Sequence, residues 1–408
     1  MALGAQSLVG WTLIYGCCVT LLTGCSTLNP RGSSLTDHAA AARQIDGPSQ
    51  YRDEGLAAEK RRSRSGIVAK YFPSLQHRKN VEKAQAEYAV AEQLFNQATT
   101  LQGVERRDAF RLAAEKFKSA AKNWPDSSFQ QDALLMKGES YFFAEDFYKA
   151  EQAYAELIKN YPRNPYVDRV DTRRFEIADY WLKHDAVDHK PFVMVNFSDN
   201  TLPLNDTRGH GKRVLEKIRL DNPIGKASDD ATMRLAVAAF EREDYETAAD
   251  TFADLRITYP DSEHQFKAQF LELQSLLLAY QGPKYASVPL TEAEKRVKQI
   301  LRQFPRESQE QREELNRTYA KIRYLLAERH WDQADFREKK KEWGSAKYYL
   351  KILVKDFSDT PFAEQAQEKL DTLADRPDDP PQYLAPLAKL FPDRGAERPW
   401  LQNTGQSK

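Results

Sequence analysis

Apolar and polar residues alternate with the period of an α-helix in residues 146–162. The apolar positions fall on one face: Ala150, Tyr154, Leu157, Ile158 and Tyr161. Pro162 ends the pattern, because a proline ring clashes with the preceding turn and disfavours helical backbone at the residue before it. The stretch therefore predicts one amphipathic helix with a fixed end.

The same pattern returns along the chain when positions are counted back from each closing residue. A small residue stands at position −12, a large apolar residue at −8, another apolar residue at −5 and usually an aromatic residue at −1. The closing residues are Pro125, Pro162, Pro260, Pro305 and Ser358, with a weaker copy at Pro223. In chain order the copies are Ala113, Phe117, Ala120, Trp124; Ala150, Tyr154, Leu157, Tyr161; Gly211, Leu215, Ile218, Asn222; Ala248, Phe252, Leu255, Tyr259; Ala293, Val297, Ile300, Phe304; and Ala346, Leu350, Leu353, Phe357.

Each copy needs a preceding helix to pack against, and small residues mark where the two helices approach each other. These residues are Gly138, Ala236 and Ala334. Paired helices of about 34 residues, with small and aromatic residues at such places and a closing proline, are typical of tetratricopeptide repeats (TPR). We expect an all-α fold, a TPR-like helical-hairpin solenoid of five to six repeats in which each unit packs mainly on its neighbours. A bundle of unrelated helices would not keep the copies in one phase.

Breaks in the pattern divide the chain into segments. We expect a signal peptide at 1–24, a flexible linker at 25–79, the N-terminal half of the repeats at 80–182, an insert loop at 183–208, the C-terminal half with a capping helix at 209–375, and a disordered proline-rich tail at 376–408. The strand-like apolar segment 190–197 lies in the insert, which is either a loop packed over the solenoid edge or a partner-binding flap. We also expect a long helix from about Glu307 to Arg337.

The N-terminus has the features of an export signal. Residues 8–22 are mostly apolar, too few for a membrane span but enough for a signal-peptide core. The run ends in Leu22-Thr23-Gly24-Cys25-Ser26, which resembles a bacterial lipobox, although no Lys or Arg precedes the apolar core. The resemblance implies cleavage before Cys25, acylation of Cys25 and, with serine rather than aspartate next, an outer-membrane location facing the periplasm. Cleavage would also remove Cys17 and Cys18, so no disulfide is expected.

Charge and candidate chemistry narrow the function. Lys plus Arg and Asp plus Glu both total 60, and this neutral balance argues against nucleic acid as the main partner. A possible metal cluster, His184, Asp185, Asp188 and His189 with His210 nearby, lacks a rigid helical arrangement, so we expect a solvated loop there and no metal. No serine has the spacing of a catalytic nucleophile. We expect no enzyme, no cofactor and no small-molecule substrate.

The lipobox and repeat endings such as Trp124-Pro125-Asp126 and Tyr259-Pro260-Asp261 together resemble the YfiO/BamD family of outer-membrane assembly lipoproteins. The resemblance covers Cys25 and about residues 80–373. It implies a periplasm-facing TPR scaffold that binds the periplasmic domains of the barrel-insertion protein and recruits unfolded outer-membrane proteins. The family has five repeats, whereas this chain has six copies, one of them interrupted. Two alternatives stay open: a TPR adaptor for cell-envelope or division complexes and, less favoured, an envelope enzyme.

Overall fold

The computed structural model describes residues 79–188, 195–196 and 199–378. Thirteen helices and no β-strand occur among these residues. The chain divides into two compact units between Ala227 and Ser228. The predicted signal peptide, the linker, most of the tail and most of the strand-like segment 190–197 lie outside the described residues.

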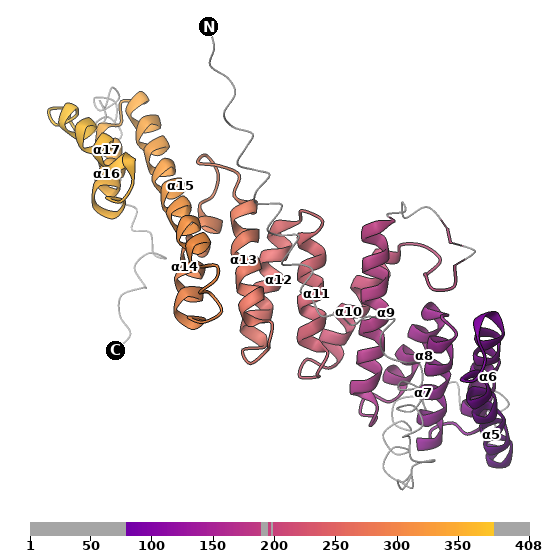
Figure 1. The fold of residues 1–408 in the computed structure, drawn as a ribbon. Coiled ribbons are helices and arrows are strands. Elements are labelled where there is room, and N and C mark those ends of the chain that lie inside the picture. Colours follow the sequence, from indigo (N-terminus) through magenta and orange to yellow (C-terminus); the bar gives the residue numbers. More distant parts are fainter. Residues whose placement is uncertain (1–78, 189–194, 197–198, 379–408) are drawn as a thin grey trace, which may run out of the picture. The chain divides into compact units, whose positions relative to one another are not determined.

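The first unit contains three consecutive helical hairpins (Figure 1). Each pairs two helices that are adjacent in sequence. The helices are α5 (Val81–Ala98) with α6 (Gly103–Asn123), α7 (Ser128–Phe143) with α8 (Phe147–Asn160), and α9 (Val167–Val187) with α10 (Thr207–Asp221).

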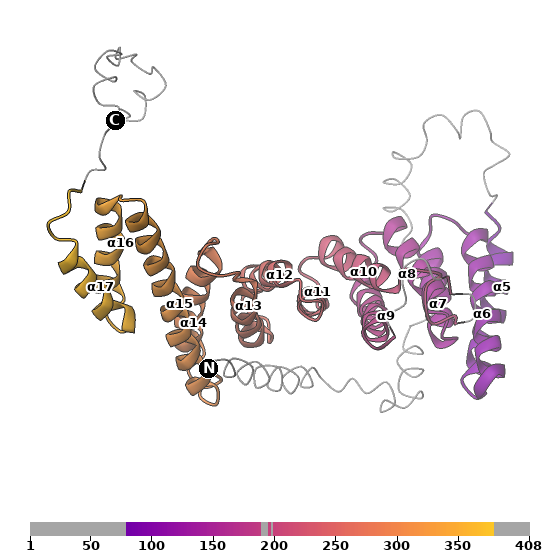
Figure 2. The same ribbon diagram turned by 90° about the horizontal axis from the view of Figure 1, so that it is seen from above.

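The second unit contains three more hairpins and a single terminal helix. The helices are α11 (Ser228–Phe240) with α12 (Tyr245–Thr258), α13 (Gln265–Ala279) with α14 (Val288–Gln303), α15 (Arg312–Lys339) with α16 (Trp343–Asp356), and α17 (Pro361–Thr372). Helix α17 packs mainly on α16 and also touches α15 (Figure 2). The predicted all-α fold of TPR-like hairpins is thus confirmed, with six hairpins among the described residues.

The repeated sequence positions form the cores of the hairpins. All eighteen residues at positions −12, −8 and −5 are buried. At five of the six hairpin ends the residue at −1 donates its backbone N–H to the carbonyl oxygen of the residue at −5, which closes the helix. One residue pattern therefore both fills the core and ends the second helix of each hairpin.

Gly138 is the closest approach within the α7–α8 hairpin. A Cβ atom added there would lie 2.5 Å from Cε1 of Tyr154, closer than van der Waals contact allows. Tyr154 is fully buried, and burying a side chain of this size stabilises the fold by about 1.5–3 kcal/mol. The small residue in the first helix is thus matched to the large residue in the second.

Several helix ends differ from the sequence prediction. The insert loop was expected to begin at residue 183, but α9 continues to Val187, and Asp188 donates its N–H to the carbonyl oxygen of His184. The long helix was expected from about Glu307 but begins at Arg312, because residues 305–311 form turns after α14. Asn80 caps α5, its side chain accepting the N–H of Lys83 at 2.9 Å.

The turn inside three hairpins has the same unusual backbone. Glu145, Glu243 and Lys341 each have φ near +60°, at 61°, 62° and 61°. Each stands two residues before the first residue of the second helix of its hairpin. This left-handed conformation costs an L-residue about 1–2 kcal/mol, so the turn is held by the packing of the two helices it joins.

Candidate partner-binding surface

Cys25, the predicted acylation site, lies outside the described residues, so acylation of Cys25 stays a prediction. No helix among the described residues is long and apolar enough to cross a membrane.

A buried carboxylate joins three helices of the first unit. The side chain of Glu139 on α7 is fully buried and accepts the hydroxyl of Tyr154 on α8 at 2.7 Å. It also accepts Arg169 at 2.8 Å and Arg173 at 3.3 Å, both on α9. Burial opposes ionisation, but the two guanidinium groups and the hydroxyl outweigh it and lower the pKa of Glu139. Glu139 is thus a structural anion whose bonds fix α9 against the α7–α8 hairpin.

Three partly exposed aromatic rings lie next to one another beside Arg173, a residue of this network. The guanidinium of Arg173 lies 4.5 Å from the ring centre of Phe142. From Phe142 the row passes to Phe147 at 5.5 Å and to Tyr180 at 5.1 Å between ring centres. Phe142 and Phe147 are half-buried, and Tyr180 is 38% exposed. We call Phe142, Phe147 and Tyr180 the aromatic row.

The aromatic row ends at the base of the insert. Thr201 anchors the insert to α9, because its carbonyl oxygen accepts the indole N–H of Trp181 at 2.7 Å and its hydroxyl lies 3.1 Å from that of Tyr180. Nearby, Val187 and Leu204 are exposed by 90% and 55%. Exposed apolar side chains beside partly exposed aromatic rings are typical of protein-binding surfaces.

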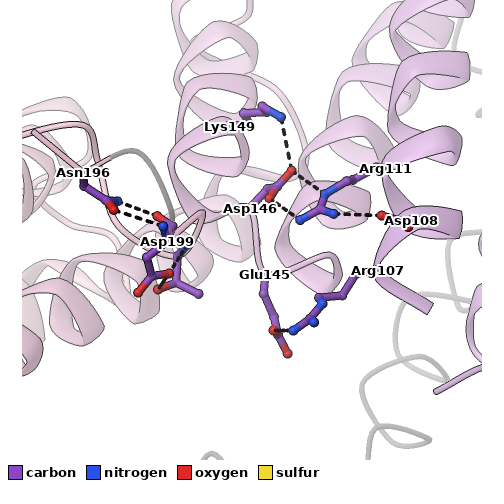
Figure 3. Close-up of polar contacts among 9 residues, drawn as sticks. Arg107, Asp108, Arg111, Glu145, Asp146, Lys149, Asn196 and Asp199 are labelled. Carbon is purple, nitrogen blue, oxygen red and sulfur yellow. Dashed lines mark hydrogen bonds and ion pairs between the residues drawn. The ribbon is translucent and has the colours of Figure 1, made fainter. Parts of the chain in front are cut away.

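The described part of the insert has its own polar framework (Figure 3). Asn196 and Asp199 bond each other twice, through the Asn196 amide and through the Asp199 backbone N–H. The carboxylate of Asp199 also accepts the backbone N–H and the hydroxyl of Thr201 at 2.9 and 2.6 Å. These bonds hold Thr201, the residue in the described part of the insert that contacts α9.

Ion pairs tie the first hairpin to the turn of the second (Figure 3). Arg111 on α6 donates two hydrogen bonds to Asp146, at 3.0 and 2.9 Å, and a third to Asp108. The hydrogen bonds to Asp146 raise the pKa of Arg111. One helical turn away, Arg107 pairs with Glu145 at 3.0 Å. Because Asp146 is almost fully buried, its carboxylate is used for packing between hairpins and is not available to a partner.

Of the possible metal cluster, the structure describes His184, Asp185, Asp188 and His210. His210 packs edge-on against Tyr148 and Trp181, and burial lowers its pKa. His184 lies at the end of α9 beside Tyr180, and it shares a cavity of about 20 Å³ at the base of the insert with Asp185 and Asp188. His189 lies outside the described residues.

A second buried carboxylate joins three helices of the second unit. Glu272 on α13 accepts Arg256 of α12 at 3.2 Å and Arg296 of α14 at 3.0 Å. Burial raises the pKa of Glu272, and the two guanidinium groups oppose this shift. The loop after α13 is held from α15, since Arg329 donates to the backbone carbonyls of Pro283 and Tyr285.

One cluster of possible metal ligands occurs among the described residues, at a place where the sequence indicated no metal site. Ligand atoms of Asp230, Glu263 and His264 all lie within 4.8 Å of one another. The imidazole of His264 is 2.6 Å from Asp230, and this hydrogen bond raises the pKa of His264. The contact links the first turn of α11 to the turn before α13.

The charged networks were missed by the sequence analysis, although a partial signal existed. Arg169, Arg173 and Glu176 follow helical spacing on α9, which indicates one charged face. The spacing does not reveal that Arg169 and Arg173 pair with Glu139, which stands 30 residues before Arg169 in the sequence. The segment Tyr259-Pro260-Asp261-Ser262 was interpreted only as a repeat ending, so the hydrogen bond between the nearby His264 and Asp230 was not predicted.

The comparisons with known protein families agree with this architecture. Residues 205–374 match the sequence model of the YfiO family, described as an outer membrane lipoprotein. Residues 132–164, which contain the α7–α8 hairpin, match the tetratricopeptide repeat. The resemblance to the YfiO/BamD family inferred from the repeat endings is therefore confirmed for residues 205–374, and the tetratricopeptide repeat is confirmed for residues 132–164. The YfiO match begins after α9, so α5 to α9 lie outside it.

No curated protein matches this chain. Among solved structures, the crystal structure of the apo form of RapI aligns with 83% of this chain and 94% of its own length, at 10% identity and a TM-score of 0.27. A likeness this weak has no bearing on fold or function.

Proposed function

We propose that this protein is a lipid-anchored TPR scaffold of the outer membrane that binds protein partners during assembly and insertion of β-barrel proteins. The YfiO match over residues 205–374 carries the proposal. Helical-hairpin arrays of this kind bind extended or helical peptides along their surface. We assign no reaction to the chain, because the two matched families are scaffolds.

Membrane attachment in this proposal depends on Cys25. Signal peptidase would remove residues 1–24, and the acylated Cys25 would anchor the protein in the inner leaflet of the outer membrane, facing the periplasm. Each buried methylene of the acyl chains contributes about 0.8 kcal/mol, so several chains hold firmly. The linker of residues 25–79 would then separate the anchor from the first hairpin.

The aromatic row is our candidate for part of the partner-binding surface. Its rings are held in place by Arg173 and by the anchored insert, and preorganised aromatic side chains lose little entropy when a partner binds. Tyr180 is the exposed end of the row and can be truncated without opening the core.

Affinity purification from detergent-solubilised envelopes, followed by mass spectrometry, tests the proposal. We expect the barrel-insertion protein to co-purify with the wild-type chain and to be reduced several-fold with Tyr180→Ala. Leu112→Ala is the matched control, because Leu112 is an exposed apolar residue on α6, a helix that contributes no residue to the aromatic row. Normal levels of β-barrel proteins after depletion of the chain would count against the assembly role.

A second candidate is an adaptor that coordinates cell-envelope or division complexes. It is favoured by one observation: α5 to α9, with the aromatic row, lie outside the YfiO match. If division or cell-wall enzymes co-purify with the wild-type chain and are lost with Tyr180→Ala, while β-barrel levels stay normal, the adaptor role replaces the assembly role.

A further inference from the structure

The last hairpin carries a concentration of positive charge. From Phe336 to Lys355 the chain has seven Lys or Arg residues and two Glu residues, although the whole chain is neutral. The positive residues are Arg337, Lys339, Lys340, Lys341, Lys347, Lys351 and Lys355. They lie at the end of α15, in the turn that follows it, and on α16.

Carboxylates neutralise only part of this charge. Arg337 pairs with Glu342 and Lys339 with Asp335, both at 2.5 Å. Lys347 pairs with Asp378 at 2.9 Å. The remaining four lysines, which we call the lysine patch, are Lys340, Lys341, Lys351 and Lys355. All four are exposed, and none forms an ion pair with another described residue.

Exposed aromatic rings accompany the lysine patch. Tyr348 is 63% exposed and lies on the same face of α16 as Lys351 and Lys355, since the three residues are spaced three and four apart. Phe336 is 50% exposed, and the ammonium of Lys340 lies 4.5 Å from its ring centre. The face of α16 with Tyr348, Lys351 and Lys355 thus combines lysines with an amphipathic aromatic ring, which is the combination found at membrane interfaces.

We propose that the lysine patch and Tyr348 dock on a membrane surface rich in anionic phospholipid. Lysine is a compact point charge on a flexible stem, which suits a diffuse layer of headgroup phosphates better than one fixed ligand. The proposal rests on the proposed function, because an acylated Cys25 would already hold the chain at the same membrane.

Vesicle co-sedimentation of residues 26–408 tests the proposal without any contribution from the lipid anchor. Vesicles of phosphatidylglycerol with phosphatidylethanolamine are compared with vesicles of phosphatidylcholine at 0.1 M and 0.5 M salt. The test variant replaces Lys340, Lys341, Lys351 and Lys355 by Gln. The matched control replaces four exposed lysines elsewhere, Lys122, Lys159, Lys226 and Lys284, and so has the same net charge. A milder variant, with only Lys351→Gln and Lys355→Gln, guards against misfolding, which thermal melts check.

We expect the wild-type chain and the control to bind anionic vesicles and to be released at 0.5 M salt, because salt screens the attraction. Each lysine lost should weaken binding by about fivefold, so the test variant should bind at least ten times more weakly. Equal binding of the test variant and the control would overturn the proposal, as would equal binding to neutral vesicles. Loss of an acidic co-purifying protein without any vesicle binding would instead assign the lysine patch to a protein. Acylation of Cys25, on which the proposed function depends, is measured in a separate experiment. Failure of the proposed function can therefore be distinguished from failure of the vesicle-binding proposal.

Discussion

At the scale of single residues, the sequence specifies the core and leaves the charged networks open. Positions −12, −8 and −5 could be assigned in all six hairpins because helix packing repeats with a fixed period and involves near neighbours in sequence. The pairing of Glu139 with Arg169 and Arg173 depends on how α9 is placed against α7, which no local pattern encodes. Residue spacing therefore predicted which side chains are buried but not which charges meet.

Gly138 and Tyr154 should be strongly coupled. Gly138→Ala places a methyl group against a fully buried ring, so we expect a loss of about 1–3 kcal/mol in the free energy of unfolding. Tyr154→Ala should cost about 3–5 kcal/mol by creating a cavity. In the Tyr154→Ala background the added methyl group has room, so Gly138→Ala should cost little there. Denaturant melts of the four proteins measure this cycle, and additive losses would contradict the close approach.

His264 should make stability depend on pH. Its hydrogen bond to Asp230 raises the pKa above the usual 6.5, so the folded state binds the proton more tightly than the unfolded state does. The contribution is full below pH 6.5 and is lost as pH rises through the folded-state pKa. The stability difference between wild type and His264→Gln should therefore be larger at pH 5.5 than at pH 8.5. Asp230→Asn should abolish this pH dependence. If wild type and His264→Gln differ in stability by the same amount at pH 5.5 and pH 8.5, His264 does not make stability depend on pH.

At the scale of helices and turns, the sequence predicts the existence of each element better than its ends. The closing proline and the preceding aromatic residue mark where the second helix of a hairpin stops, and the structure agrees within two residues at Pro162 and Pro260. The start of α15 was placed too early, because the residues before it are polar and no cap distinguishes a turn from a first helical turn. Helix starts without capping side chains are thus the weak point of the prediction.

The turn before α16 offers a stabilising substitution. Lys341 has φ of 61°, where glycine pays no steric penalty, so Lys341→Gly should raise the free energy of unfolding by about 1 kcal/mol. Lys340→Gly is the control, because Lys340 has φ of −85° and glycine there gains nothing from the conformation. Thermal melts compare the two variants. If Lys341→Gly is no more stable than Lys340→Gly, the left-handed turn carries no strain.

At the scale of the whole molecule, the repeat pattern and the family match cover different lengths of the chain. The repeat pattern predicted hairpins from residue 80 onward, and the YfiO match covers those from residue 205. The family match therefore spans the helices of the second unit, whereas α5 to α9, which form two hairpins and the first helix of a third, lie outside it. The aromatic row lies in that additional part, which is why variants there distinguish the assembly role from the adaptor role.

Replacing Cys25 by serine should reduce the amount of the protein in the outer-membrane fraction without changing its fold. In Cys25→Ser the acyl acceptor is absent, so we expect no incorporation of radiolabelled palmitate and either an unprocessed precursor or release from the outer-membrane fraction. Cys18→Ser is the matched control, since it alters a cysteine within the apolar core and should leave labelling and location unchanged. Equal palmitate labelling of both variants would show that the anchor is elsewhere. Unlabelled wild-type protein in the soluble fraction would remove the membrane from the proposed function, while the hairpins and their partner-binding surface would stand.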